Sequence, residues 1–442
     1  MSRTPARATL VLIVALVLLA FTAPAAEGSE RSSGGSSHPS SSRLYVPPPP
    51  DGSLTQVATL APRGRLRDAA LVLKEVTTPQ AVWFTKGTPA QVRAAVRKTM
   101  AGAALQRAVP TLVAYNLPYR DCGQYSAGGA AGTAAYDAWI DAFAAGIGDR
   151  RATVVLEPDG LGLIPNYVSA LDGSSNCTLA TPPGAPADGA PTPQNRFDQL
   201  NHAVDTLTSH PQVSVYLDAT HTAWQNVGES ADRLVKAGVQ RAAGFFVNAS
   251  NYQYTPNLSQ YGTWVSQCLA YATSVNVGDY NGCPNQYWNG GPSNGWNGVA
   301  LNNYGVWSDT ASAADLNTLG VNERYASMLG STAPTAHFVV DTSRNGQGPW
   351  QPAVAYPDAQ DWCNPPGRGL GDRPTTVTGN PLLDAKLWIK TPGQSDGQCN
   401  RGVAGATTDP EWGGITDPAA GDWFPAQALQ LAQLAAPPLL AH

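Results

Sequence analysis

Two short segments of the chain carry acidic side chains at places where they could do acid–base chemistry. Glu157 and Asp159 flank a proline directly after an apolar run. A carboxyl group that is partly buried at the end of a strand loses hydration, which raises its pKa, and an acid with a raised pKa can donate a proton near neutral pH. Asp121 follows Arg120, whose charge can hold the carboxylate ionised. Two carboxyl groups in unlike environments are typical of glycosidic-bond hydrolysis.

Short apolar runs recur along the chain, and helical stretches lie between them. The runs are 81–85, 111–117, 153–157, 213–218, 244–248, 337–341 and 386–390. Continuous rather than alternating apolarity indicates strands that are buried on both faces, as in a parallel sheet covered by helices. We expect helices at 89–105, with Thr88 as N-cap, at 134–147 and at 194–209. The pattern predicts an α/β barrel of seven strands that need not be complete.

Aspartates follow five of these runs, where the loops of an α/β barrel carry the chemistry. They are Asp121, Asp159, Asp218, Asp341 and Asp396. Any single aspartate at such a place could instead cap a helix or pair with an arginine. We expect a structural role for Asp341, and we expect Arg344 to contact Asp396 and keep it ionised. Among the tryptophans, Trp139 and Trp388 are assigned to packing.

The N-terminal part of the chain indicates export. In residues 1–26, Arg3 and Arg7 precede a short apolar run and a small-residue segment, which is typical of a secretory signal peptide. An uncleaved anchor is the alternative, although the run is short for a membrane span. Residues 27–43 form a Ser/Gly-rich flexible linker, and residues 44–442 contain no repeat and no second linker. We expect one extracellular domain that, after cleavage of the signal, does not bind membranes.

The composition of the chain argues against nucleic acid as a partner and against a metal or other cofactor. Only 13% of residues are charged and the net charge is -5, so the chain has little material for a nucleic-acid surface. The six cysteines, Cys122, Cys177, Cys268, Cys283, Cys363 and Cys399, suit disulfides in an exported protein, but their pairing stays open at this point. No CxxC spacing and no ligand-like histidine pair occur, so we expect no metal and no other cofactor.

Five motifs in order along the chain resemble glycoside hydrolase family 6, the inverting cellulases. The motifs are Arg120-Asp121-Cys122, Glu157-Pro158-Asp159, Tyr216-Leu217-Asp218 with His221 and Trp224, Asp361-Trp362-Cys363-Asn364, and Lys390 with Ser395-Asp396-Gly397. The resemblance runs from about Trp83 to Trp423. It implies a distorted seven-stranded parallel β/α barrel, similar to a TIM barrel, and hydrolysis of β-1,4-glucan with inversion. Residues 44–442 are then the glycoside hydrolase catalytic domain.

The resemblance also implies roles for single residues. Asp159 matches the general acid, Asp121 the carboxylate that supports its protonation, and Asp396 the residue usually proposed as the base that acts on water. Substrate-binding positions are implied for Trp83, Tyr115, Ser126, Asp218, His221, Trp224, Asn251, Trp362 and Lys390. Inversion requires room for water, so the carboxyl groups of Asp159 and Asp396 should lie about 6.5–9.5 Å apart. By similarity, Cys122 pairs with Cys177 and Cys363 with Cys399, which leaves Cys268 and Cys283 for each other.

The loop after Asp396 separates two modes of action. Only Gly397 and Gln398 lie between Asp396 and Cys399, whereas tunnel-forming members of the family carry a long loop there. We therefore expect an open cleft and a monomeric endo-β-1,4-glucanase that cuts cellulose internally. The alternatives are a cellobiohydrolase that releases cellobiose from chain ends and a non-catalytic glucan-binding protein. The long stretch 264–307, which contains several tryptophans, is expected to form an aromatic lip of the groove.

Overall fold

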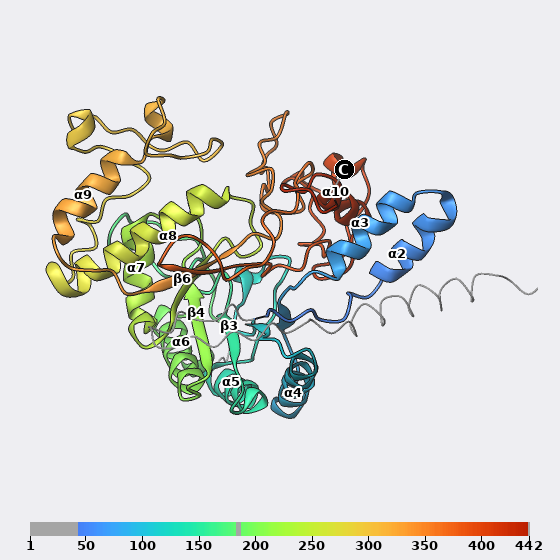
Figure 1. The fold of residues 1–442 in the computed structure, drawn as a ribbon. Helices are drawn as coiled ribbons and strands as arrows, with labels where there is room; N and C mark the ends of the chain where they lie inside the picture. The colour runs from blue at the N-terminus through green and yellow to red at the C-terminus, as the bar shows by residue number, and fades with distance from the viewer. Residues whose placement is uncertain (1–42, 183–186, 441–442) are drawn as a thin grey trace, which may run out of the picture.

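A computed structural model describes residues 43–182 and 187–440, and Figure 1 shows their fold. The predicted signal peptide lies outside the described residues, as does all of the predicted linker except Arg43. Within the described part, no helix is both long enough and apolar enough to cross a membrane.

Seven parallel strands pair in sequence order and form one curled sheet. They are β1 (Val82–Phe84), β2 (Thr111–Ala114), β3 (Ala152–Leu156), β4 (Val213–Asp218), β5 (Gly244–Val247), β6 (His337–Asp341) and β7 (Leu383–Leu387). The predicted α/β barrel of seven parallel strands is confirmed. The last strand, β7, begins three residues before the expected 386–390. Its buried residues Leu383, Ala385 and Leu387 alternate with half-exposed Asp384 and Lys386, so it contains no continuous apolar run. A search for continuous apolarity misses such a strand.

The ring of strands stays open between β1 and β7. Within residues 43–182 and 187–440, no strand pairing joins these two strands. The backbone N–H of Ala81 donates to the carbonyl of Trp388 at 2.9 Å, and the indole N–H of Trp83 donates to the carbonyl of Ile389 at 2.8 Å. These two contacts form a seam where an eighth strand would complete a barrel.

Helices cover the outer face of the sheet. Those that alternate with the strands are α4 (Pro89–Leu105), α5 (Thr133–Ile147), α6 (Pro193–Thr208), α7 (Val227–Lys236), α8 (Thr255–Ala270) and α9 (Leu319–Leu329). Short helical turns lie at Ala61–Arg63, Asp121–Gly123, Ala187–Gly189, Val239–Arg241, Tyr271–Val275, Pro292–Asn294, Ala314–Leu316 and Pro410–Trp412. Thr88 caps α4 as expected: its hydroxyl accepts from the N–H of Gln91, whose side chain accepts from the N–H of Thr88.

Alternate residues of each strand pack on opposite sides of the sheet. In β2, Leu112 and Ala114 join the large cluster beneath the helices, whereas Val113 joins a smaller cluster inside the partial barrel, together with Tyr115 just beyond the strand. This alternation follows from the two-residue period of a strand. Trp139 is buried among the helices, so its assignment to packing is confirmed. The inner cluster reaches beyond the strand ends at Tyr115, Ala249 and Ile389.

Three helices near the two ends of the described chain form a separate layer, which we call the terminal clasp. They are α2 (Ser53–Leu60), α3 (Leu66–Val76) and α10 (Pro425–Gln433), and they lie side by side in Figure 1. The side chain of Gln433 donates to Asp68 at 2.9 Å. Trp388, the other tryptophan assigned to packing, is buried against Leu71 and Leu431 of the clasp. The clasp therefore packs on the seam.

Candidate active site

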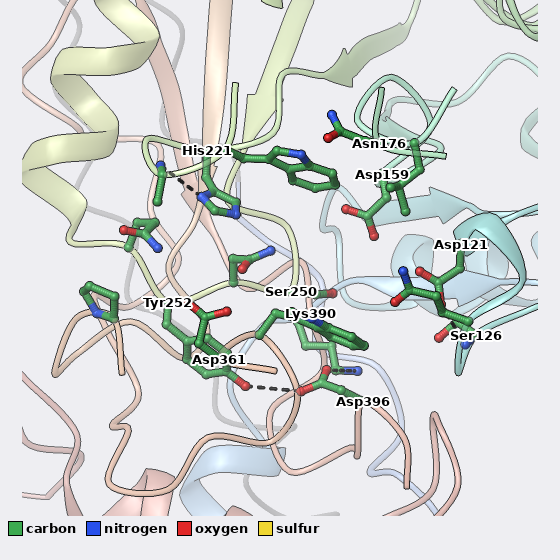
Figure 2. A pocket seen from close by; sticks show the side chains of 18 of the residues that line it. Asp121, Ser126, Asp159, Asn176, His221, Ser250, Tyr252, Asp361, Lys390 and Asp396 are labelled. Carbon is green, nitrogen blue, oxygen red and sulfur yellow. Dashed lines mark hydrogen bonds and ion pairs between the residues drawn. The ribbon is translucent and has the colours of Figure 1, made fainter. Parts of the chain in front are cut away.

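A cavity of about 390 Å³ opens at the carboxyl ends of the strands (Figure 2). Every predicted catalytic and substrate-binding residue except Asp218 lines it: Trp83, Tyr115, Asp121, Ser126, Asp159, His221, Trp224, Asn251, Trp362, Lys390 and Asp396. A second hollow of about 750 Å³ shares Trp83, Tyr115, Ser126 and Lys390 with the first. The two hollows therefore lie next to each other, and we call them together the groove.

The turn after β3 aims Asp159 at the cavity. Glu157 and Asp159 both adopt left-handed backbone conformations, with φ of 55° and 62°. Such conformations are strained for residues other than glycine and collect at functional sites. The buried carboxyl group of Glu157 holds the turn, because it accepts from the backbone N–H groups of Asn116 at 2.9 Å and Leu117 at 3.1 Å. Burial raises the pKa of Glu157 to about 7. Glu157 is thus a structural link between two loops.

The surroundings of Asp159 favour its protonated form. Burial raises the pKa of this carboxyl group well above its ordinary value, and the nearby carboxyl groups of Asp218 and Asp121 raise it further. Among the described residues, no protein group donates a hydrogen bond to the Asp159 side chain, so nothing offsets these effects by bonding to the charged form. The electrostatics of the site thus suit a proton donor.

Asp121 is held beside Asp159 by the backbone. The N–H of Ser126 donates to Asp121 Oδ2 at 2.8 Å. Burial raises the pKa of Asp121, whereas this hydrogen bond and the charge of Arg120 lower it. Arg120 acts here by its charge and donates no hydrogen bond to the carboxylate. The Arg120 guanidinium instead donates to the carbonyls of Thr85 and Tyr115 and lies 4.6 Å from the Tyr115 ring centre.

Asp218, which the resemblance implies as a substrate-binding position, is buried and lies outside the cavity lining. Its carboxylate accepts from the backbone N–H groups of Thr220 at 2.9 Å, Gly162 at 3.2 Å and Leu161 at 3.3 Å. The loop after β3 therefore covers Asp218, and burial raises its pKa to about 6. Its effect on the site is electrostatic, through Asp159.

Asp396 has the opposite environment. Arg344 Nη1 donates to Asp396 Oδ2 at 2.8 Å, and Lys390 Nζ lies 3.0 Å from Oδ1. The Tyr252 hydroxyl and the Asn364 N–H donate to Oδ2 at 3.2 and 3.0 Å. Burial alone would raise the pKa of Asp396, but the charges of Arg344 and Lys390 outweigh it and lower the pKa to about 2. The expected contact between Arg344 and Asp396 is confirmed.

Two partners of Asp396 were not predicted, although one of them, Asn364, belongs to a motif that carries the resemblance. Tyr252 carries no local sequence signal, because its partner Asp396 lies 144 residues further along the chain. Asn364 has a weak signal, since asparagine tolerates the left-handed conformation that it adopts here, with φ of 42°. Its side chain donates to Asp417 at 2.8 Å and fixes the loop that supports Asp396. Asp341 is buried and accepts from several backbone N–H groups, which confirms its structural role.

Aromatic rings line the rest of the groove. Trp83 meets the edge of Tyr115 at 5.3 Å between ring centres, and Trp224 lies 5.7 Å from His221. Burial lowers the pKa of His221 to about 4, so this imidazole is neutral at pH 7. Trp362 stands 5.9 Å from Tyr125. Flat rings with neutral polar neighbours suit a ligand that has both apolar faces and hydroxyl groups.

Three disulfides fix the loops that bear the site. They join Cys122 to Cys177, Cys268 to Cys283 and Cys363 to Cys399, which is the pairing implied by the resemblance. Cys122 directly follows Asp121, and Cys363 directly precedes Asn364. Cross-links at these places limit the freedom of the loops that carry the carboxyl groups.

Comparison with known sequences identifies related proteins. The profile of Glycosyl hydrolases family 6 matches residues 39–435. Endoglucanase A of Thermobispora bispora is 32% identical over 361 residues, which are 81% of this chain and 56% of that protein. The match thus spans little more than half the length of that relative. Endoglucanase 1 of Streptomyces halstedii is 34% identical over 80% of this chain and 81% of its own length. A probable 1,4-beta-D-glucan cellobiohydrolase C of Aspergillus terreus is 31% identical over 74% of this chain and 59% of its own length.

Solved structures share the fold. An endoglucanase from Mycobacterium tuberculosis, in complex with a methyl-cellobiosyl-thio-cellobioside, superimposes with a TM-score of 0.59 at 30% identity, covering 89% of this chain and 97% of its own. The catalytic core of a cellobiohydrolase from Chaetomium thermophilum gives a TM-score of 0.57 at 25% identity and covers 90% and 98%. By its profile match, its relatives and its partial barrel, the chain belongs to glycosyl hydrolase family 6.

Proposed function

We propose that this chain is a secreted endo-β-1,4-glucanase that hydrolyses internal bonds of cellulose with inversion. One observation carries the proposal. Two aspartates face the same cavity, and their surroundings shift their pKa values in opposite directions: burial and like charges raise that of Asp159 well above its ordinary value, whereas two cations lower that of Asp396 to about 2. In Figure 2 the two carboxyl groups enter the cavity from different sides. An acid and a carboxylate on two sides of the scissile bond are what hydrolysis of a glycoside requires.

In the proposed reaction, Asp159 donates its proton to the glycosidic oxygen as the bond from that oxygen to the anomeric carbon breaks. A water molecule placed by Asp396 and Ser126 attacks the opposite face of the carbon and forms the new bond. Asp396 is a weak base because its pKa is about 2. It can still accept the proton of this water, since a water oxygen that is bonding to the sugar becomes strongly acidic.

Asp121 supports the acid in this scheme. Its carboxyl group helps to raise the pKa of Asp159, and its negative charge, when ionised, stabilises the positive charge that develops on the sugar. Trp83, Trp224 and Trp362 stack on the apolar faces of glucose rings, while Asn251, His221 and Lys390 contact hydroxyl groups. We place no sugar contact on Asp218, because the loop after β3 covers it.

The endo mode is supported by the shape of the groove and by related proteins. A second hollow shares Trp83 with the cavity and offers room for a chain beyond it. Only two residues separate Asp396 from Cys399. Relatives with the printed name endoglucanase are 32% and 34% identical to this chain. A cellobiohydrolase is the second candidate, because relatives with that printed name are about equally similar, at 31%.

Two measurements test the proposal. NMR of the first product released from cellotetraose should show inverted configuration at the new reducing end; retained configuration would refute the mechanism. The viscosity of carboxymethylcellulose should fall quickly relative to the number of new reducing ends. A slow fall would favour the cellobiohydrolase, and no cleavage of either substrate would leave a glucan-binding protein.

Export is part of the same proposal. Three disulfides in the described residues suit an oxidising compartment, and the sequence of residues 1–26 is typical of a signal peptide. N-terminal sequencing of the protein from the culture medium should begin after Ala25 or Ala26. Recovery of the uncleaved chain in the membrane fraction would support the anchor instead.

A further inference from the structure

The segment between α8 and α9 carries aromatic side chains that the proposed reaction does not use. We call residues 276–318 the aromatic insertion. The sequence predicts an aromatic lip here, but Trp264 and Trp307, at or near the ends of the predicted stretch, are buried against each other in the core. Tyr287 and Trp296 are different, because they expose 45% and 50% of their surface. Two large aromatic rings exposed on one short segment make that segment a candidate binding surface.

The insertion is anchored to the loop that bears Trp224. The buried side chain of Gln286 donates to the carbonyls of Thr222 at 3.0 Å and Gln225 at 2.8 Å. The Tyr287 hydroxyl donates to the carbonyl of Trp224 at 3.2 Å. Since Trp224 lines the cavity, Tyr287 connects the exposed part of the insertion to a loop of the cavity.

A second aromatic unit follows directly along the insertion. Trp288 and Trp296 stack with their planes 13° apart and their ring centres 6.2 Å apart. The guanidinium of Arg324, on α9, lies 4.9 Å from Trp288 and 5.6 Å from Trp296. The backbone N–H of Trp296 donates to the carbonyl of Gly291 at 3.0 Å. The half-exposed Trp296 ring is therefore held in a fixed orientation before any ligand arrives.

We propose that Tyr287 and the Trp288–Trp296 pair form a glucan-binding extension of the groove, which takes the part of a β-1,4-glucan chain that leaves the cavity past Trp224. The inference rests on the proposed function for the identity of the ligand. Its own support is the contact of Gln286 and Tyr287 with the loop that bears Trp224, and aromatic rings that stay about half exposed although Arg324 packs against the tryptophan pair. Rings fixed beforehand lose little conformational entropy when a sugar stacks on them.

The test separates long from short substrates. In an Asp159→Asn background, which cannot hydrolyse the ligand, Trp296→Ala should weaken binding to insoluble cellulose about five- to tenfold, the size typical of losing an aromatic anchor. In the active enzyme, kcat/KM for cellotetraose should stay unchanged, since this substrate occupies the cavity alone. Trp296→Tyr should restore most of the binding. The control Leu66→Ala removes an apolar side chain of 66% exposure from α3 and should change neither measurement.

Each result has one meaning. Unchanged cellulose binding by Trp296→Ala and Tyr287→Ala, in an enzyme that cleaves cellotetraose, overturns the inference and leaves the proposed function intact. Equal losses on both substrates, or no recovery with Trp296→Tyr, also overturn it, because a folding defect rather than stacking would then explain the result. Failure of the wild-type chain to cleave or bind any glucan refutes the proposed function itself.

Discussion

The loops after β2 and β3 and the end of β4 bring Asp121, Asp159 and Asp218 to one side of the active site, whereas the loops after β6 and β7 bring Arg344, Lys390 and Asp396 to the other. On the first side, burial raises the pKa of every aspartate, and like charges add to this effect for Asp121 and Asp159. On the second side, two cations lower the pKa of a carboxyl group that is no less buried. Burial is common to both sides, so the charged neighbours decide which aspartate gives a proton and which stays ionised.

The largest expected effect comes from removing the acid itself. Asp159→Asn should lower kcat on cellotetraose by about 10²–10⁴-fold, as for the loss of a general acid, while Kd changes little because the side chain keeps its size. Initial rates and calorimetric binding measure the two quantities. Asp361→Asn, which neutralises another carboxyl group of the cavity lining, is the control and should keep most of the activity. A near-wild-type rate for Asp159→Asn would show that Asp159 is not the general acid.

Breaking the ion pair between Arg344 and Asp396, on the second side, should lower the free energy of unfolding. Arg344→Met leaves Asp396 with Lys390 alone, and removal of one partner of a buried ion pair costs about 3–5 kcal/mol of the free energy of unfolding. It should also raise the pKa of Asp396, so that activity at acid pH is lost at a higher pH than in the wild type. Denaturant unfolding and the pH profile of kcat/KM report these effects. Arg233→Met, which breaks the buried pair with Glu229, should lower stability without moving the acid limb.

The sign of the pH dependence follows from the same ion pair. The pKa of Asp396 is about 2, below the ordinary value of 3.8. The stability contributed by its ionised form is therefore present above about pH 4 and is lost as the pH falls through 2. The wild type should lose this contribution between pH 4 and 2 in denaturant titrations, whereas Arg344→Met should lose less. Equal losses in both proteins would contradict the assignment.

Asp218 tests whether like charges set the pKa of the acid. Asp218→Asn removes a negative charge that raises the pKa of Asp159, so the alkaline limb of kcat/KM should move to lower pH. Activity at its new optimum should fall far less than in Asp159→Asn. Asparagine cannot accept from all three N–H groups that bond Asp218, which costs about 1–3 kcal/mol of stability. An unmoved alkaline limb would show that burial alone raises the pKa of Asp159.

The smallest expected effect concerns the hydroxyl of Tyr252. Tyr252→Phe keeps the ring beneath Arg344, whose guanidinium lies 4.4 Å from its centre, and removes only the hydrogen bond to Asp396. We expect the free energy of unfolding to fall by about 1 kcal/mol. The acid limb of the kcat/KM profile should move to slightly higher pH. Tyr216→Phe removes a comparable hydrogen bond, to Asp384, outside the cavity lining and should leave the pH profile alone. Matching profiles for the two variants would exclude Tyr252 from the tuning of Asp396.

The sequence predicts one side of this comparison better than the other. Apolar runs place the strands, and the aspartates follow the strands directly, so Asp121 and Asp159 can be found from local patterns. Asp218 is equally visible, but its burial depends on the loop after β3, which no local pattern reveals. The pair of Asp396 with Arg344 was expected, while Tyr252 and Asn364 reach Asp396 from loops far away in the chain. Such partners depend on tertiary contacts that composition and spacing do not encode.

The open seam between β1 and β7 gives the terminal clasp a second importance. Trp83 lines the groove, and its indole also bridges the seam to Ile389, while the clasp packs on Trp388 next door. The first and last helices of the described chain therefore stabilise the seam beside Trp83, the side chain on which we propose that a glucose ring stacks. Proteolysis or heating that detaches the helices of the terminal clasp should therefore weaken binding of the glucan before the central sheet unfolds.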